Sequence, residues 1–250
     1  MRRHLSVLAL WARGTLGWVL GVLAAMAAAE TALFWRVLAG SKGETPAGID
    51  GLLAASGVYW ACAIAFVMVM ALLVFSGCEF QGSRLSYTLR RLSIREEAAV
   101  LWQAGYHLIC LLLFWAVQTA VLLGLCLWYT RAADPAYVSG QTVFLAFYRI
   151  GLLHGLLPLE DWGLYLRNIV FLLALAVDGA CAGLRQRRGG SAAMPLFLAL
   201  LAVWFVPDRF AMAGGLDAGL AMACAGLIPL AIDLAYLRTG RGEEAAAHEA

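Results

Sequence analysis

The sequence predicts an all-α, polytopic membrane protein with six transmembrane helices and both termini on the cytoplasmic side. Of its 250 residues, 63% are hydrophobic and only 14% are charged, and the mean hydropathy is +0.80. Soluble domains typically contain about 45–50% apolar and about 25% charged residues. One water-soluble core of this length cannot hold the apolar surplus. We therefore expect the chain to be inserted in a lipid bilayer.

Apolar runs along the chain provide the expected transmembrane helices. A helix needs about 17–25 residues to cross about 30 Å of hydrocarbon, and five of the six runs meet this length. The fifth run is short, and Pro195 lies near its start. The predicted spans are residues 15–38, 52–75, 105–129, 164–183, 193–206 and 218–237. Together they make a transmembrane domain over residues 15–237.

The first 14 residues predict a short interfacial helix whose arginines face lipid phosphates. The residues expected to face lipid are Leu5, Leu8, Leu10 and Trp11. A basic start, an apolar run and small residues at 25–29 also resemble a cleaved secretory signal. However, Arg13 interrupts the early apolar stretch, and the apolar run continues past Glu30. These two features favour a first span that is retained.

The positions of the basic residues predict the orientation. With the N-terminus inside, the inner segments hold 12 of the 18 basic residues and the outer segments hold 5. Basic residues collect on the cytoplasmic side of membrane proteins. We therefore expect a multi-pass protein of the plasma or inner membrane, with its N- and C-termini inside. The small, polar tail over residues 238–250 cannot bury a core and is expected to be disordered.

Several functional classes are not expected. A net charge of only +2 argues against a nucleic-acid partner. The six cysteines form no metal-like or redox spacing and are expected to pack as small apolar residues. The chain has no hydrolase, metalloprotease or ATP-binding motif, so we expect no catalytic residues, no cofactor and no enzyme activity. His154, Glu160 and Asp161 share an outer loop, but this pattern is too weak to predict a metal site.

The inner segment 79–97, between the second and third spans, combines leucines on one helical face with arginines on a second face. One interpretation is an interfacial helix whose arginines bind lipid phosphates and maintain the topology. The other is a docking element for a cytoplasmic partner. The docking candidates are Arg84, Leu85, Leu89, Arg90, Arg91, Leu92 and Arg95.

A capping-box pattern, Ser93 to Glu96, lies within the same segment. It predicts that a new helix begins at Ser93 and runs into the third span. A second amphipathic segment, residues 141–162, lies on the outer side between the third and fourth spans. Arg149, His154 and Pro158 interrupt its apolar residues, so we expect a helix that lies at, or dips into, the outer leaflet.

The phrase Tyr87-Thr-Leu-Arg-Arg-Leu-Ser-Ile-Arg, between the second and third of six spans, resembles the ABC-2-type membrane permeases. The expected N-terminal interfacial helix and the inside location of both termini are also similar to that family. The resemblance implies the permease subunit of an ATP-driven transporter, an exporter, that pairs with a second permease subunit and with separate ATP-binding subunits. Segment 79–97 would then be the coupling helix. The alternative is a non-transporting scaffold, assembly or sensor subunit.

Polar residues within the predicted spans need partners. A charged side chain at the centre of a bilayer costs about 2.5–3.5 kcal/mol on insertion scales. The candidate residues of a transport path are Glu30, Gln118, Asp178 and Asp233. The alternative is pairing between helices near the interface, which we favour for Asp178 and Asp233.

Overall fold

The computed structural model describes residues 2–41, 48–78, 96–159, 161–187, 193–205 and 226–235. Every regular element in these ranges is a helix, so the expected all-α class is confirmed. Within the described residues, four helices are long and apolar enough to cross a membrane, at Trp11–Gly40, Val58–Gly77, Glu97–Ala132 and Trp162–Gln186. The chain is therefore a membrane-embedded helical protein.

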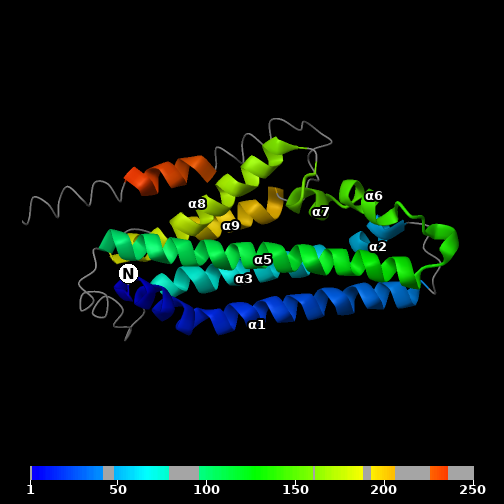
Figure 1. The fold of residues 1–250 in the computed structure, drawn as a ribbon, viewed down its shortest axis with the longest axis horizontal. Helices are drawn as coiled ribbons and strands as arrows, with labels where there is room; N and C mark the ends of the chain where they lie inside the picture. Colours follow the sequence, from blue (N-terminus) through cyan, green and yellow to red (C-terminus); the bar gives the residue numbers. More distant parts are fainter. Residues whose placement is uncertain are drawn as a thin grey trace, which may run out of the picture.

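Two helices, α1 (Arg2–Gly40) and α5 (Glu96–Ala132), run side by side along the length of the molecule (Figure 1). They contain 39 and 37 residues, which corresponds to about 58 and about 56 Å at 1.5 Å per residue. Both are longer than the hydrocarbon layer of about 30 Å. Each therefore has enough length to continue beyond the lipid tails.

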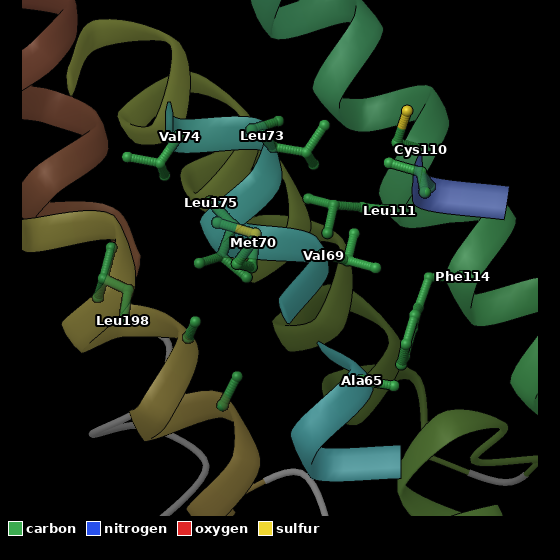
Figure 2. Packing of buried hydrophobic residues seen from close by; sticks show 14 of the residues in the cluster. Ala65, Val69, Met70, Leu73, Val74, Cys110, Leu111, Phe114, Leu175 and Leu198 are labelled. Carbon is green, nitrogen blue, oxygen red and sulfur yellow. The ribbon is translucent and has the colours of Figure 1, made fainter. Parts of the chain in front are cut away.

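The main core forms where α3 (Val58–Gly77), α8 (Trp162–Arg187) and α9 (Met194–Phe205) pack against the N-terminal parts of α1 and α5. Figure 2 shows Val69, Met70 and Leu73 of α3 between α5, which supplies Leu111, and α8, which supplies Leu175. These helices are apolar on nearly every face, as expected for helices that contact other helices on one side and lipid on the other.

A second core closes the opposite end of the α1–α5 pair, away from the N-terminus (Figure 1). Here α2 (Gly48–Ser56), a 3-10 turn at Pro135–Tyr137, α6 (Thr142–Arg149) and α7 (Gly151–Leu156) gather around the ends of the two long helices. We call this group the cap. Its core includes Phe34 of α1, Leu53 of α2 and Leu153 of α7.

Several expected boundaries differ from the structure. The interfacial helix 1–14 and the span 15–38 form one continuous helix, α1, and Trp11 is packed in the main core at 5% exposure, so the expectation that Trp11 faces lipid was wrong. The expected span 52–75 is divided at Gly57, whose φ of +75° favours glycine and separates α2 from α3. Hydropathy could not reveal this division, because both sides of Gly57 are apolar.

The remaining spans agree in position but not always in length. α5 and α8 cover the expected spans 105–129 and 164–183 and extend them at both ends. α9 has 12 residues within the expected span 193–206, and a short apolar helix at Gly226–Ala235 lies within the expected span 218–237. Over the part of the chain that the structure describes, neither helix is long enough to count as a candidate span. The expected segment 141–162 contains α6 and α7.

Two expectations fall outside the described ranges. Residues 79–95 contain all seven docking candidates, and residues 238–250 form the C-terminal tail. The helix expected to begin at Ser93 is observed from Glu96 onward as α5.

Exposed tryptophans indicate the depth of α1 in the bilayer. Trp18 and Trp35 are 71% and 58% exposed, and they lie 17 residues apart, or about 26 Å along the helix axis. Tryptophan is enriched at both membrane interfaces. Exposed arginines, Arg13 and Arg36, lie next to this interval on α1. The interval between the two tryptophans thus matches the hydrocarbon layer, and Glu30 lies inside it.

Candidate functional site

Glu30 and Gln118 form a buried polar contact between the two longest helices. Val19, Leu23, Met26, Glu30 and Phe34 recur at helical spacing and make the buried face of α1, so the carboxyl group points into the bundle. Gln118 approaches from α5, and its Nε2 donates a hydrogen bond of 3.2 Å to Oε2 of Glu30. Both side chains are 0% exposed.

The contact leaves two buried acceptor atoms without donors. Oε1 of Glu30 and Oε1 of Gln118 have no hydrogen-bond partner. From α3, the thiol of Cys62 lies within electrostatic range of the Glu30 carboxyl. In the part of the chain that the structure describes, no basic side chain pairs with Glu30. An acid buried in this way is costly and unusual.

An apolar cavity of about 90 Å³ has Cys62 in its wall. Residues from α3, α5, α7, α8 and α9 line it, and Cys62 connects its wall with the surroundings of Glu30. Its larger lining side chains are Tyr59, Phe66, Phe114, Trp115 and Phe171. The polar surface of the cavity is small, so it favours apolar groups over water or ions.

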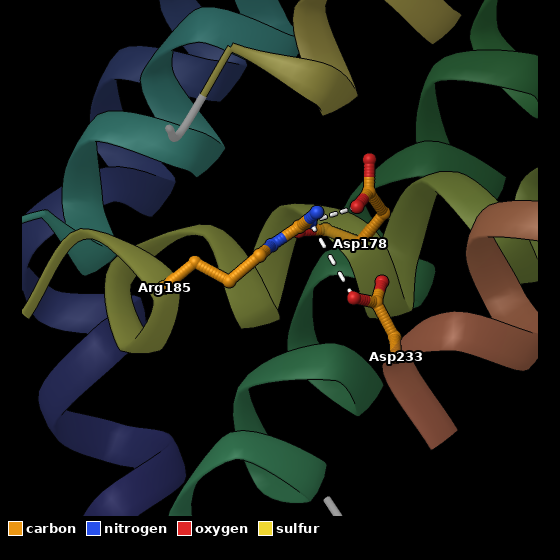
Figure 3. Close-up of polar contacts among 3 residues, drawn as sticks. All are labelled: Asp178, Arg185 and Asp233. Carbon is orange, nitrogen blue, oxygen red and sulfur yellow. Dashed lines mark hydrogen bonds and ion pairs between the residues drawn. The ribbon is translucent and has the colours of Figure 1, made fainter. Parts of the chain in front are cut away.

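Asp178, Arg185 and Asp233 form a second polar cluster, nearer the N-terminal end of the bundle (Figure 3). Asp178 and Arg185 lie seven residues apart on one face of α8, and Asp233 comes from the helix Gly226–Ala235. Nη2 of Arg185 donates to Oδ1 and to the backbone oxygen of Asp178, and it lies 3.6 Å from Oδ1 of Asp233. The arginine therefore links the two helices.

Three of the four predicted transport-path residues thus have a carboxyl group buried between helices, and the fourth, Gln118, binds one of them. The structure does not join them into one site. Glu30 and Gln118 contact each other between α1 and α5, whereas Asp178 and Asp233 share Arg185 near the end of α8.

A third buried pair, Gln103 and His107 on α5, was not among the predicted site residues. Their Nε2 atoms lie 3.5 Å apart, and the side chains are 4% and 1% exposed. Gly179 of α8 lies opposite, where an added Cβ would lie 3.2 Å from Nδ1 of the histidine. The spacing of four residues places both side chains on one helical face and could have indicated a buried polar contact.

A fourth polar group ties the cap to the membrane helices. Nδ2 of Asn168 on α8 donates to the backbone oxygen of Gly155 at 2.7 Å, and Nε1 of Trp115 on α5 donates to that of Leu156 at 3.0 Å. Arg167, which lies within the expected span 164–183, is buried and donates to Oδ1 of Asn168. These bonds satisfy carbonyl groups at the C-terminal end of α7.

Within the described residues, no group of three or more metal-ligating side chains lies close enough together to hold a metal ion. Comparisons of the chain with protein-family models, with curated proteins and with solved structures found no match. The fold and the buried polar groups alone define the class of protein. It is a helical membrane protein with ionisable residues between its spans.

Proposed function

We propose that the chain is the permease subunit of an ATP-driven, ABC-type exporter in the plasma or inner membrane. It would act with a second permease subunit, identical or different, and with a separate cytoplasmic ATP-binding subunit. The observation that carries the proposal is the Glu30–Gln118 contact, because an ionisable residue inside a membrane typically marks a path for ions or substrates. The ATP-binding partner rests on the resemblance of segment 79–97 to the coupling helix of such permeases.

In the proposed topology, the chain crosses the membrane six times and both termini lie inside. α1, α3, α5 and α8 supply four of them. α9 and the helix Gly226–Ala235 would belong to the fifth and sixth. In this orientation the cap lies outside, and the Asp178–Arg185–Asp233 cluster lies towards the cytoplasm, next to the ends of α8 and α5.

Co-purification tests the ATP-binding partner. The intact chain is purified in mild detergent beside an Arg90→Glu/Arg91→Glu variant, and the proteins that co-purify are identified and assayed for ATP hydrolysis. We expect an ATPase with the wild type and its loss from the variant. An Arg238→Glu/Arg241→Glu variant is the matched control, because it removes two other arginines of the expected inner side.

If the folded wild type carries no ATPase, the permease proposal is wrong and the chain is better described as a scaffold or sensor subunit. If both charge-reversal variants lose the ATPase, segment 79–97 is not the specific dock.

A further inference from the structure

We propose that Glu30 and Gln118 form a binding site for one monovalent cation, either a proton or Na⁺, between α1, α3 and α5. The proposal goes beyond transport coupled to an ATPase, and it applies to the isolated chain. It rests on the geometry of the two side chains and on the absence of a basic partner for Glu30 in the described ranges.

The first argument is that two buried oxygen atoms of the site lack hydrogen-bond donors. Oε2 of Glu30 accepts from Gln118, but Oε1 of Glu30 and Oε1 of Gln118 have no donor. Nearly all buried polar atoms in proteins are paired with a partner, and here two acceptors from neighbouring helices remain. A proton on the carboxyl group would supply a donor for these acceptors, and a cation that takes oxygen ligands would bind them directly.

Charge is the second argument. Glu30 is completely buried, and burying an isolated carboxylate is far more costly than burying a paired one. The titratable group that faces it from α3 is the Cys62 thiol, and the group that faces it from α5 is the uncharged Gln118 amide. Neither can neutralise a carboxylate. One positive charge would balance the site, whereas a divalent ion would leave it with an excess.

The Asp178–Arg185–Asp233 cluster differs from the Glu30 site because it contains its own positive charge. Its carboxylates already contact a guanidinium group, so part of their charge is balanced by the protein itself. The cluster therefore serves as an internal control for a change at Glu30. Asp233→Asn removes a buried carboxyl group from the same chain without changing any residue of α1 or α5.

The experiment uses the purified full chain in detergent. In the first arm, Tm is measured while NaCl replaces choline chloride at constant ionic strength and constant pH. In the second arm, infrared difference spectra between acidic and alkaline buffers detect the C=O band of a protonated carboxyl group. Both arms are run on the wild type, on Glu30→Gln and on Asp233→Asn.

If the ligand is Na⁺, the Tm of the wild type and of Asp233→Asn rises by several degrees with NaCl, because a ligand that binds only the folded state stabilises it. Glu30→Gln shows no rise. If the ligand is a proton, NaCl has no effect, and a carboxyl band present in the wild type and in Asp233→Asn is missing from Glu30→Gln. The isosteric Gln preserves the side-chain shape, and the infrared arm needs only folded protein.

The proposal is overturned if Glu30→Gln retains the Na⁺ response and every carboxyl band of the wild type, or if the wild type shows neither. Because no ATPase is present, a negative result here leaves the proposal of an ATP-driven permease standing. Conversely, if no ATPase co-purifies with the chain, the proposal of a cation site still stands.

Discussion

At the scale of single residues, Arg185 touches two carboxyl groups but can neutralise only one of them. Asp178 and Asp233 are both fully buried, and the guanidinium group joins α8 to the helix Gly226–Ala235. A buried ion pair contributes little beyond an apolar replacement, but removal of one partner leaves an uncompensated charge. The cluster should therefore be more sensitive to the loss of Arg185 than to the neutralisation of all three groups.

Arg185→Gln is expected to destabilise the folded protein by roughly 3 kcal/mol, because it leaves two buried acids without a cation. Arg131→Gln, at an exposed position near the end of α5, is the control and should have little effect. Denaturant unfolding in mixed micelles measures both. A triple variant that also carries Asp178→Asn and Asp233→Asn should recover most of the loss. If the Arg185→Gln variant is as stable as the control, Arg185 contributes nothing to the stability of the fold.

A second prediction concerns the hydrogen bond between the hydroxyl groups of Thr15 and Tyr106, which are 2.7 Å apart and link α1 to α5. Hydrogen bonds between membrane helices average about 0.6 kcal/mol. We expect a coupling energy of this size in a cycle of Thr15→Val, Tyr106→Phe and the double variant. The free energy of unfolding of all four proteins gives the coupling, and a value of zero would contradict the contact.

The sequence was sufficient to identify Glu30, Gln118, Asp178 and Asp233 as polar residues within apolar helices, but it could not pair them. Gln118 is 88 residues from Glu30, and the pairing depends on how α1 and α5 are rotated against each other. Arg185 lies just beyond the end of the expected span 164–183. Its interaction with Asp233 depends on where the last helix packs, which no local pattern contains.

At the scale of elements, α3 and α8 cross closely where Gly183 faces the backbone of Gly77. A Cβ added to Gly183 would collide with the carbonyl oxygen of Gly77. Small residues allow the backbones of membrane helices to approach in this way. Gly77 is itself close to the amide group of Gln103, so three helices depend on the absence of side chains at this crossing.

Gly183→Ala should destabilise the protein by roughly 1–3 kcal/mol, the range typical of overpacked cores. Gly124→Ala on α5 is the matched control, because an added Cβ there meets nothing within 4 Å. Since alanine favours helices by about 1 kcal/mol over glycine, the control should be neutral or stabilising. Thermal unfolding of both variants tests the difference. Equal effects would show that the crossing is not tight.

Asn168→Ala should loosen the cap while it leaves the main core intact. The substitution removes the donor to the carbonyl oxygen of Gly155, but Trp115 still holds Leu156. Hydrogen–deuterium exchange should therefore become faster in α7 (Gly151–Leu156) and remain unchanged in α3 (Val58–Gly77). Faster exchange in both helices would instead indicate a general loss of stability.

Element types could be predicted from apolar runs, whereas element boundaries could not. The division at Gly57 lies within a continuous apolar run, and a left-handed glycine leaves no trace in hydropathy. The expected division of α1 at residue 14 was wrong for the opposite reason, because the charged Arg13 interrupts the apolar stretch without ending the helix. Tertiary contact explains the difference, because Trp11 and Val19 both pack in the main core.

At the scale of the whole molecule, the proposed orientation places the cap outside and the N-terminal end of the bundle inside. Ala136 in the cap and Gln186 near the end of α8 are both exposed. A membrane-impermeant thiol reagent applied to intact cells should label Ala136→Cys and not Gln186→Cys. The five described cysteines are buried, so the background from them should be low. Labelling of Gln186→Cys alone would show that the orientation is the reverse of the one proposed.

The lengths of α1 and α5 have a mechanical consequence. The two helices pack along each other and share both cores, so they can act as one stiff lever of about 58 Å. Tilting such a lever by about 10° around the end away from the cap would displace the cap by about 10 Å. A small push on one side of the membrane would thereby be amplified on the other without any helix having to bend.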